Sequence, residues 1–233
     1  MVKYRMPYIM DITDINGVNK EMWDGYGMPT NKVMFDMANE AYQKTPAKKV
    51  DGWTLLQPYS NGIKAYLKDR DIVVAVRGTA DGRDVQADLQ ILYSGLPNSS
   101  RFKEDERIIQ TIQQKFKPRH YNYYGVGHSL GGAILDELID RGYIKEGISY
   151  NPAVDLSKFR NDTRNHRIYN SSDALYNIMG RFTKNPEVRK NKLSTLGKIA
   201  SFIPLGMLGN SINAHLLSNF EGGYGISFDH IMI

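Results

Sequence analysis

Apolar positions along the chain follow two spacings, one typical of helices and one typical of strands. Apolar residues three and four positions apart predict amphipathic helices, and they recur over residues 30–42, 104–116 and 130–142. Short runs rich in β-branched and aromatic residues predict strands, and they cover residues 53–56, 62–67, 71–76, 121–124, 147–151 and 167–170. Residues 71–76 are apolar at nearly every position, which indicates a strand buried on both faces.

The order of these elements indicates the fold class. Strands and helices alternate, so we expect an α/β fold with a mostly parallel central sheet covered by helices. The sequence shows no linker, internal repeat or low-complexity tract that would separate two domains. We therefore expect one domain over residues 1–233, with residues 1–28 as a loop-rich lead-in. Pro118 and Gly142 are placed to end the second and third helices.

The composition says more about the cellular compartment of the protein than about any reaction that it catalyses. The chain is 41% hydrophobic and 24% charged, as in an ordinary globular protein, and it has no cysteine. The lack of cysteine excludes disulfides, thiolate metal sites and cysteine nucleophiles, and it favours a reducing compartment. Residues 1–11 contain no apolar run of signal-peptide length. We expect a cytoplasmic or virus-associated protein without a signal peptide or membrane span.

The candidate chemistry centres on the motif Gly127-His128-Ser129-Leu130-Gly131. It stands between a predicted strand and a predicted helix, which is the sequence pattern of a nucleophile elbow. In such a turn the serine has a positive φ, and side chains two positions before and after it would collide as strand and helix close on each other. We predict a nucleophile elbow at Ser129; the alternative is a glycine-rich turn with a passive serine.

A nucleophilic serine needs a base. The chain has five histidines, which are His120, His128, His166, His215 and His230. His128 adjoins the serine, so its side chain should point away from it. His120 and His166 stand at the starts of predicted strands, remote from the strand ends. His215 and His230 remain, both late in the chain, where an order of Ser, Asp and His would place the base.

The base in turn needs an orienting carboxylate just after a strand that follows the serine. Asp173 fits this position, because the predicted strand over residues 167–170 ends shortly before it. Asp155 and Asp162 are less well placed, one after Asn151-Pro152 and the other within a polar loop.

Several blocks taken together resemble the class 3 lipases, the fungal-type family of the α/β-hydrolase superfamily. In chain order the blocks are Val76-Arg77-Gly78-Thr79, Asp84-Val85-Gln86-Ala87-Asp88-Leu89, the serine motif with Gly132, and Asn170-Ser171-Ser172-Asp173-Ala174-Leu175. A shorter match, Asn213-Ala214-His215, lies near the place where that family carries its base. The resemblance covers residues 30–220.

The resemblance implies an α/β-hydrolase fold and a serine carboxylic-ester hydrolase that acts on lipid esters without a metal or organic cofactor. It makes Ser129 the nucleophile, Asp173 the orienting acid and His215 the base. Thr79 and Leu130 would form the oxyanion hole, in which loss of one donor typically raises the barrier by about 3–4 kcal/mol. The family's lid would lie around residues 81–97. The alternatives are a small-ester esterase, a phospholipase A-type activity, or a catalytically incomplete hydrolase-like protein that binds membranes.

Residues 181–212 combine a basic block with an apolar block. Residues 181–198 contain six Lys and Arg residues and a single acidic residue, Glu187. Lys198 is the only charged residue in residues 193–212. The segment is interpreted as a partly buried cap, as an interfacial element that contacts an anionic membrane, or as a span, which its glycines and Pro204 disfavour. Expected partners are therefore a lipid or ester substrate and an anionic membrane surface. No nucleic acid is expected.

Overall fold

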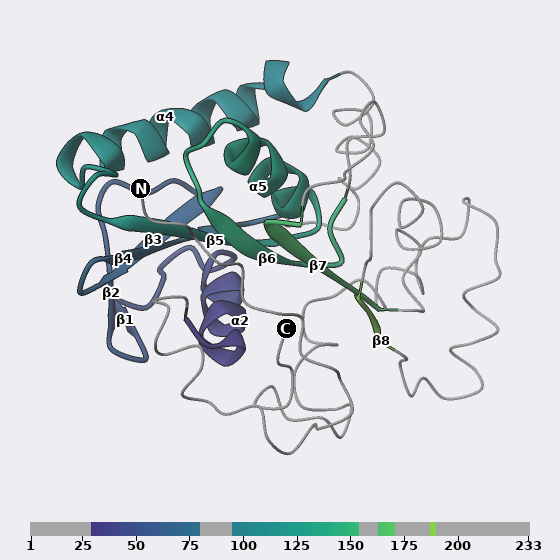
Figure 1. The fold of residues 1–233 in the computed structure, drawn as a ribbon, viewed down its shortest axis with the longest axis horizontal. Coiled ribbons are helices and arrows are strands. Elements are labelled where there is room, and N and C mark those ends of the chain that lie inside the picture. Colours follow the sequence, from purple (N-terminus) through teal and green to yellow (C-terminus); the bar gives the residue numbers. More distant parts are fainter. Residues whose placement is uncertain (1–28, 80–94, 154–162, 171–186, 190–233) are drawn as a thin grey trace, which may run out of the picture.

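The computed structural model describes residues 29–79, 95–153, 163–170 and 187–189, and these hold one eight-stranded sheet in the order β1-β2-β3-β4-β5-β6-β7-β8 (Figure 1). The strands are β1 (Lys49–Val50), β2 (Trp53–Leu55), β3 (Ile63–Lys68), β4 (Asp71–Val76), β5 (Asn122–His128), β6 (Glu146–Tyr150), β7 (Asn165–Asn170) and β8 (Glu187–Arg189). Neighbours from β1 to β4 are antiparallel, and those from β4 to β8 are parallel. The expected mostly parallel sheet is confirmed.

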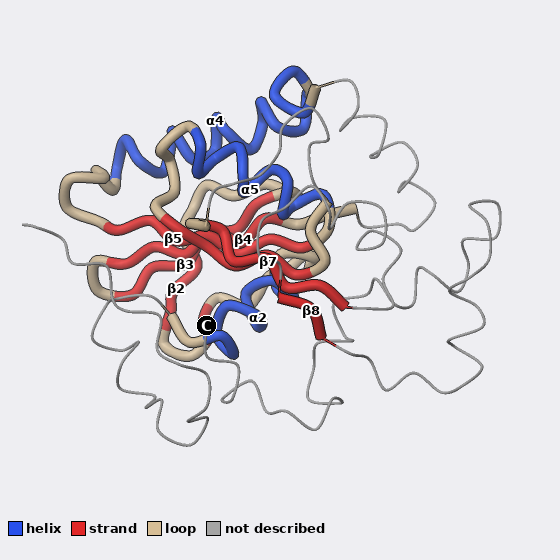
Figure 2. The backbone as a smooth tube through the Cα atoms, turned by 45° about the vertical axis from the view of Figure 1, so that its right-hand side comes forward, coloured by secondary structure: helices blue, strands red, loops and turns tan. Residues whose placement is uncertain are grey.

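Helices cover both faces of the sheet. They are α2 (Asn31–Glu40), α4 (Ser100–Lys115) and α5 (Leu130–Asp140), with a 3-10 turn η1 (Leu96–Asn98) before α4. Helices α4 and α5 lie on one face and α2 on the other (Figure 2). Ile72, Val74 and Val76 pack into the core under α4 and α5, whereas Val73 and Ala75 pack into the core under α2. Strand β4 is thus buried on both faces, as its sequence predicts.

The parallel register brings the functional candidates to one edge of the sheet. Val76 at the end of β4 is level with Gly127 of β5, and His128 is level with Tyr150 at the end of β6. Because parallel strands have their carboxyl ends at the same edge, the residues that follow β4, β5 and β6 lie side by side there.

The predicted helix starting at Glu104 in fact begins at Ser100. The side chain of Ser99 caps it, because Oγ accepts a hydrogen bond from Phe102 N–H at 3.1 Å. The expectation was wrong by one turn, since that turn carries mostly polar residues and the apolar period starts later. Gly142 ends α5 as predicted, with a φ of 75° that a left-handed helix end requires.

Two short strands were not predicted. Strand β1 has two residues, and β8 has three and pairs with β7; neither is long enough to show a period. Strand β8 lies in the basic part of residues 181–212. The other residues of that segment lie outside the described part, as do residues 1–28. Within the described ranges, none of the helices is both long and apolar enough to cross a membrane.

Candidate functional site

Ser129 stands alone between the end of β5 and the start of α5. Its backbone has φ 57° and ψ −128°, a sparsely populated conformation that costs on the order of 1–3 kcal/mol. Its N–H donates to the Tyr150 carbonyl at 3.2 Å, and its own carbonyl accepts from Gly132 and Ala153 N–H, both at 2.9 Å. These bonds to the end of β6 and the first turn of α5 hold the strained turn in place.

The expected collisions at the flanking glycines are confirmed, with one difference. A Cβ atom on Gly127 would lie 2.7 Å from the carbonyl oxygen of Gly131, so strand and helix do close on each other there. A Cβ atom on Gly131 would instead meet the carbonyl of Val76 and lie 2.9 Å from the carbonyl carbon of Arg77. The second glycine is therefore required by the neighbouring strand β4, and it brings the start of α5 onto the residues after that strand.

Leu130 is the first residue of α5, and its side chain is buried in the core. The first N–H groups of a helix have no acceptor within the helix, and they lie at the positive end of its dipole. The Leu130 N–H therefore belongs to a helix start directly after Ser129, a position that suits an anion.

The segment Arg77-Gly78-Thr79 leaves the end of β4 next to Ser129. A Cβ atom on Gly78 would lie 2.7 Å from Ser129 Cβ and would meet the carbonyl oxygen of His128. Gly78 thus packs its backbone directly against the turn, and Thr79 follows it as a half-buried residue. The structure brings together three predicted participants: Ser129, Leu130 and the segment that carries Thr79.

His128 turns away from Ser129, as expected. Its Nδ1 lies 2.6 Å from Tyr42 Oη, and the two rings meet edge to face with centroids 5.7 Å apart. His166 is the second residue of β7, and His120 lies in the turn before β5. Both therefore lie at the edge of the sheet opposite Ser129, as the sequence predicts, and that neither of them is the base stays a prediction.

The remaining candidates lie outside the described residues. These are Asp173 and His215, the alternative base His230, the alternative acids Asp155 and Asp162, and residues 81–94 of the expected lid. The roles of these residues stay predictions.

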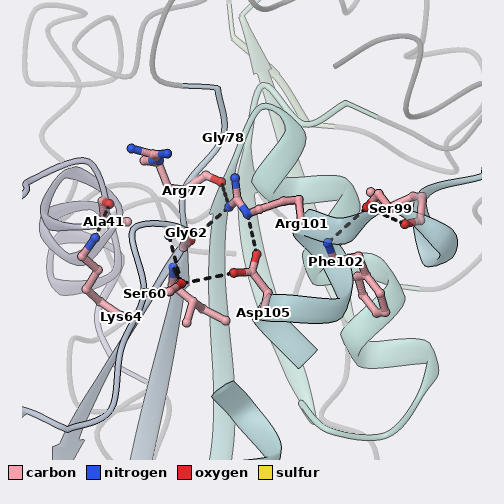
Figure 3. Close-up of polar contacts among 12 residues, drawn as sticks. Ala41, Ser60, Gly62, Lys64, Arg77, Gly78, Ser99, Arg101, Phe102 and Asp105 are labelled. Atoms are coloured by element: carbon pink, nitrogen blue, oxygen red, sulfur yellow. Dashed lines mark hydrogen bonds and ion pairs between the residues drawn. The ribbon is translucent and has the colours of Figure 1, made fainter. Parts of the chain in front are cut away.

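One polar cluster beside the site was not predicted (Figure 3). Arg101, in the first turn of α4, donates from Nε to Asp105 at 2.7 Å and from Nη2 to the carbonyl oxygens of Arg77 at 2.6 Å and Gly62 at 3.1 Å. Asp105 is fully buried, and this burial raises the pKa of its carboxyl group despite the nearby Arg101. The sequence signal was a carboxylate on the apolar face of α4, in line with Phe102 and Ile109.

A second buried charge lies close to this cluster. Lys64 in β3 is almost fully buried, and its Nζ donates to the carbonyl oxygen of Ala41 at the end of α2 at 3.0 Å. Burial, together with the positive charges of Arg77 and Arg101, lowers the pKa of Lys64 to about 8. The side chain holds the end of α2, where Tyr42 follows, against the sheet.

Among the residues that the structure describes, no three His, Cys, Asp or Glu side chains are grouped so that they could hold a metal ion. Ser129 has a strained backbone and lies beside the start of α5 and the backbone of Gly78. The site therefore offers the Ser129 hydroxyl together with backbone N–H donors.

No protein-family model and no curated protein matches the chain. Seven chains among the solved structures match this chain. One is a fungal lipase–inhibitor complex, whose structure gave a model for interfacial activation in lipases. It has 16% identity and a TM-score of 0.45, and the match covers 80% of this chain and 96% of that one. A mutant form of MDLA from Penicillium cyclopium has 17% identity and a TM-score of 0.46, with 92% and 99% covered.

Proposed function

We propose that the chain is a serine carboxylic-ester hydrolase that acts on lipid esters, with a nucleophile elbow at Ser129. One observation carries this proposal. Ser129 has φ 57° between a strand and a helix, and both the helix start and the backbone of Gly78 lie against it. A strained conformation persists where the surroundings enforce it, and a passive glycine-rich turn gives no reason to enforce it at a serine.

The proposed reaction proceeds through an acyl-enzyme. Ser129 Oγ attacks the acyl carbon while His215, oriented by Asp173, takes the hydroxyl proton and then gives it to the departing alcohol. Water, deprotonated by the same base, attacks the acyl-enzyme and releases the carboxylic acid. In both steps the carbonyl oxygen gains negative charge, and the N–H groups of Thr79 and Leu130 are the donors proposed to stabilise it.

Covalent labelling tests the nucleophile. We expect a fluorophosphonate probe to label the full chain at Ser129, and Ser129→Ala to abolish both labelling and ester hydrolysis. The matched control is Ser100→Ala, because Ser100 is an exposed serine at the first position of α4. If Ser129 in the unaltered chain stays unlabelled, the enzyme proposal is wrong, and the hydrolase-like membrane-binding protein replaces it.

The base is tested by comparing His215→Ala with His230→Ala. Loss of the true base should lower kcat by several orders of magnitude, whereas the other variant should retain nearly full turnover of a soluble ester. A large loss in His230→Ala alone would assign the base to His230.

The lipid substrate class and the peripheral membrane contact need separate measurements. Hydrolysis of an emulsified triacylglycerol, a phospholipid and a short soluble ester by one preparation distinguishes a lipase from a phospholipase and from a small-ester esterase. If residues 181–212 dock on anionic lipid, Phe202→Ser with Ile203→Ser should reduce binding to vesicles that contain anionic lipid while soluble-ester turnover is kept. An equal loss of both would make the segment a structural cap.

A further inference from the structure

We propose that Tyr42 and Arg101 are positioning residues that hold the peptide group between Arg77 and Gly78 at both of its ends, and thereby place the Thr79 N–H beside Ser129. The inference rests on the proposed function, because Thr79 matters as an oxyanion donor only if Ser129 attacks an ester. It concerns how this chain positions that donor, through one side chain in the turn after α2 and another in the first turn of α4.

The peptide group is held from two sides. Its carbonyl oxygen, which belongs to Arg77, accepts a hydrogen bond from Arg101 Nη2 at 2.6 Å. Its N–H, which belongs to Gly78, donates to Tyr42 Oη at 3.1 Å. A peptide group is planar, so fixing its oxygen and its N–H fixes the orientation of the whole plane. The next amide along the chain is that of Thr79.

Arg101 is itself fixed. Its Nε is paired with the fully buried Asp105, and its Nη2 also reaches the carbonyl oxygen of Gly62. That oxygen accepts the Arg77 N–H at 2.8 Å as well. The last register pair of β3 and β4 is Ile63 with Val76. One residue further, Arg101 bridges the two strands by donating to the carbonyl oxygens of both Gly62 and Arg77. A Cβ atom at position 62 would lie 2.6 Å from Asp105 Oδ1, so a side chain there would displace the pair of Arg101 and Asp105.

Tyr42 is fixed from the other side. Its hydroxyl lies 2.6 Å from His128 Nδ1, so the group that accepts from Gly78 can donate its own proton to a neutral imidazole. His128 immediately precedes Ser129. A single hydroxyl group thus connects the residue before the proposed donor Thr79 with the residue before the proposed nucleophile, and it couples their relative positions.

The geometry matters because a preset donor works only at the right place. Displacement by about 1 Å can cost about a hundredfold in rate, and Gly78 is the residue type with the greatest backbone freedom. Between the held peptide and the Thr79 N–H only the two dihedral angles of Gly78 remain. These are confined by Ser129 Cβ and the His128 carbonyl, which lie where a side chain on Gly78 would be.

The decisive variant is Tyr42→Phe, which removes the hydroxyl and keeps the ring against His128. We expect kcat for a soluble ester to fall by about tenfold to a hundredfold, with KM nearly unchanged. This loss is smaller than that for removing an oxyanion-hole donor, because the Thr79 N–H is displaced and not removed. Affinity for a trifluoromethyl ketone should fall by the same factor. Attack of Ser129 Oγ on that inhibitor forms a C–O bond and breaks the carbonyl π bond. The hydroxyl proton passes to the proposed base His215, and the negatively charged oxygen that remains mimics the transition state.

The matched control is Tyr123→Phe, which also removes a hydroxyl that is hydrogen-bonded to the backbone, in this case by donating to the Phe116 carbonyl at 2.6 Å. It should lower thermal stability without changing kcat or inhibitor affinity. For Arg101 the variant is Arg101→Met with Asp105→Leu, because removing the arginine alone would leave a buried carboxylate unpaired. This double variant should fold and show the same fall in kcat. Wild-type kcat and inhibitor affinity in a folded Tyr42→Phe protein would overturn the proposal.

Failure of the proposed function has a different signature. Amide hydrogen exchange at Gly78 and Thr79 needs no substrate, and Tyr42→Phe should accelerate it locally while Tyr123→Phe does not. If the unaltered chain is unreactive toward fluorophosphonate and Tyr42→Phe nevertheless shows this local acceleration, the hydrolase proposal fails and the two-sided hold on the peptide remains. Unchanged exchange in Tyr42→Phe would refute the hold itself.

Discussion

At the residue scale, Gly78 determines how closely the segment after β4 approaches Ser129. A Cβ atom at this position would lie 2.7 Å from Ser129 Cβ and 2.9 Å from Tyr42 Oη, and it would meet the His128 carbonyl. We expect Gly78→Ala to push the segment away from the turn and to lower ester hydrolysis by about a hundredfold or more, since a displacement of about 1 Å suffices for that. Rates of acyl-enzyme formation with a chromogenic ester measure the effect.

Gly142 is the matched control for this glycine. It has φ 75°, and nothing lies within 4 Å of a Cβ atom placed there. Gly142→Ala should therefore lower the free energy of unfolding by about 1 kcal/mol through backbone strain alone and leave hydrolysis unchanged. Equal rates in the two variants would contradict a role for the close approach at position 78.

The same scale shows what the sequence predicts about the site and what it misses. The turn at Ser129 was predictable because its motif encodes a local backbone conformation, with each glycine two residues from the serine. Tyr42 and Arg101 were not, because they act on a peptide group 36 and 24 positions away along the chain. Neither contact leaves a period or a motif. The one local sign, the i to i+4 pair of Arg101 and Asp105, looks like an ordinary surface ion pair until its burial is known.

At the element scale, the start of α4 decides where Arg101 lies. Ser99 Oγ accepts from Phe102 N–H at 3.1 Å and donates to the Leu96 carbonyl at 2.8 Å. Ser99→Ala should lower the free energy of unfolding by about 1 kcal/mol, the usual contribution of such a cap. Urea denaturation against Ser100→Ala, which alters only an exposed side chain one residue later, measures it. Indistinguishable midpoints for the two variants would show that the cap does not stabilise α4.

Element prediction from the sequence worked where burial imposes a period over a full helix or strand, as in α2, α5 and β4. It gave the wrong start for α4 because the first turn is held by a polar cap and a buried ion pair rather than by apolar contacts. It missed β8 because three residues define no period, and their pairing with Ile168 to Asn170 depends on the neighbouring strand.

At the scale of the whole molecule, a buried charge network connects α5 to the sheet. Asp136 Oδ1 accepts from Arg167 Nη2 at 2.5 Å and from Asn165 Nδ2 at 2.7 Å, and Asn165 in turn accepts from Ser149 in β6. Arg167→Met should lower the free energy of unfolding by about 3–5 kcal/mol, because it leaves a buried carboxylate without its cation.

The double variant Arg167→Met with Asp136→Leu separates the charge effect from lost packing. It removes the unpaired carboxylate, so we expect it to recover a large part of the lost stability. Chemical denaturation of both variants measures this. If the double variant is less stable than Arg167→Met alone, the network stabilises the fold beyond its charge balance.

Buried titratable groups also determine how the whole fold responds to alkali. Burial raises the pKa of Tyr124 from 10.0 to about 12, and it raises the pKa of Tyr66 and Tyr123 as well. Above pH 10 the unfolded chain loses these phenolic protons before the folded protein does, so the stability that they contribute is present below pH 10 and declines as pH rises toward 12. Lys64 acts in the opposite direction. Its pKa is lowered from 10.5 in the unfolded chain to about 8 in the folded protein. Between these two pH values the unfolded chain binds more protons than the folded protein, so the free energy of unfolding rises with pH there.

The expected profile is therefore a free energy of unfolding that holds or rises between pH 8 and about 10 and then falls steeply. Lys64→Met should remove the rising contribution, because no group at that position then binds more protons in the unfolded chain than in the folded protein. Tyr124→Phe should make the fall above pH 10 shallower, since one of the three phenols no longer ionises on unfolding. Urea midpoints at pH 8, 10 and 11.5 distinguish the two effects. A Lys64→Met profile parallel to that of the unaltered chain from pH 8 to 10 would mean that the buried lysine keeps its ordinary pKa.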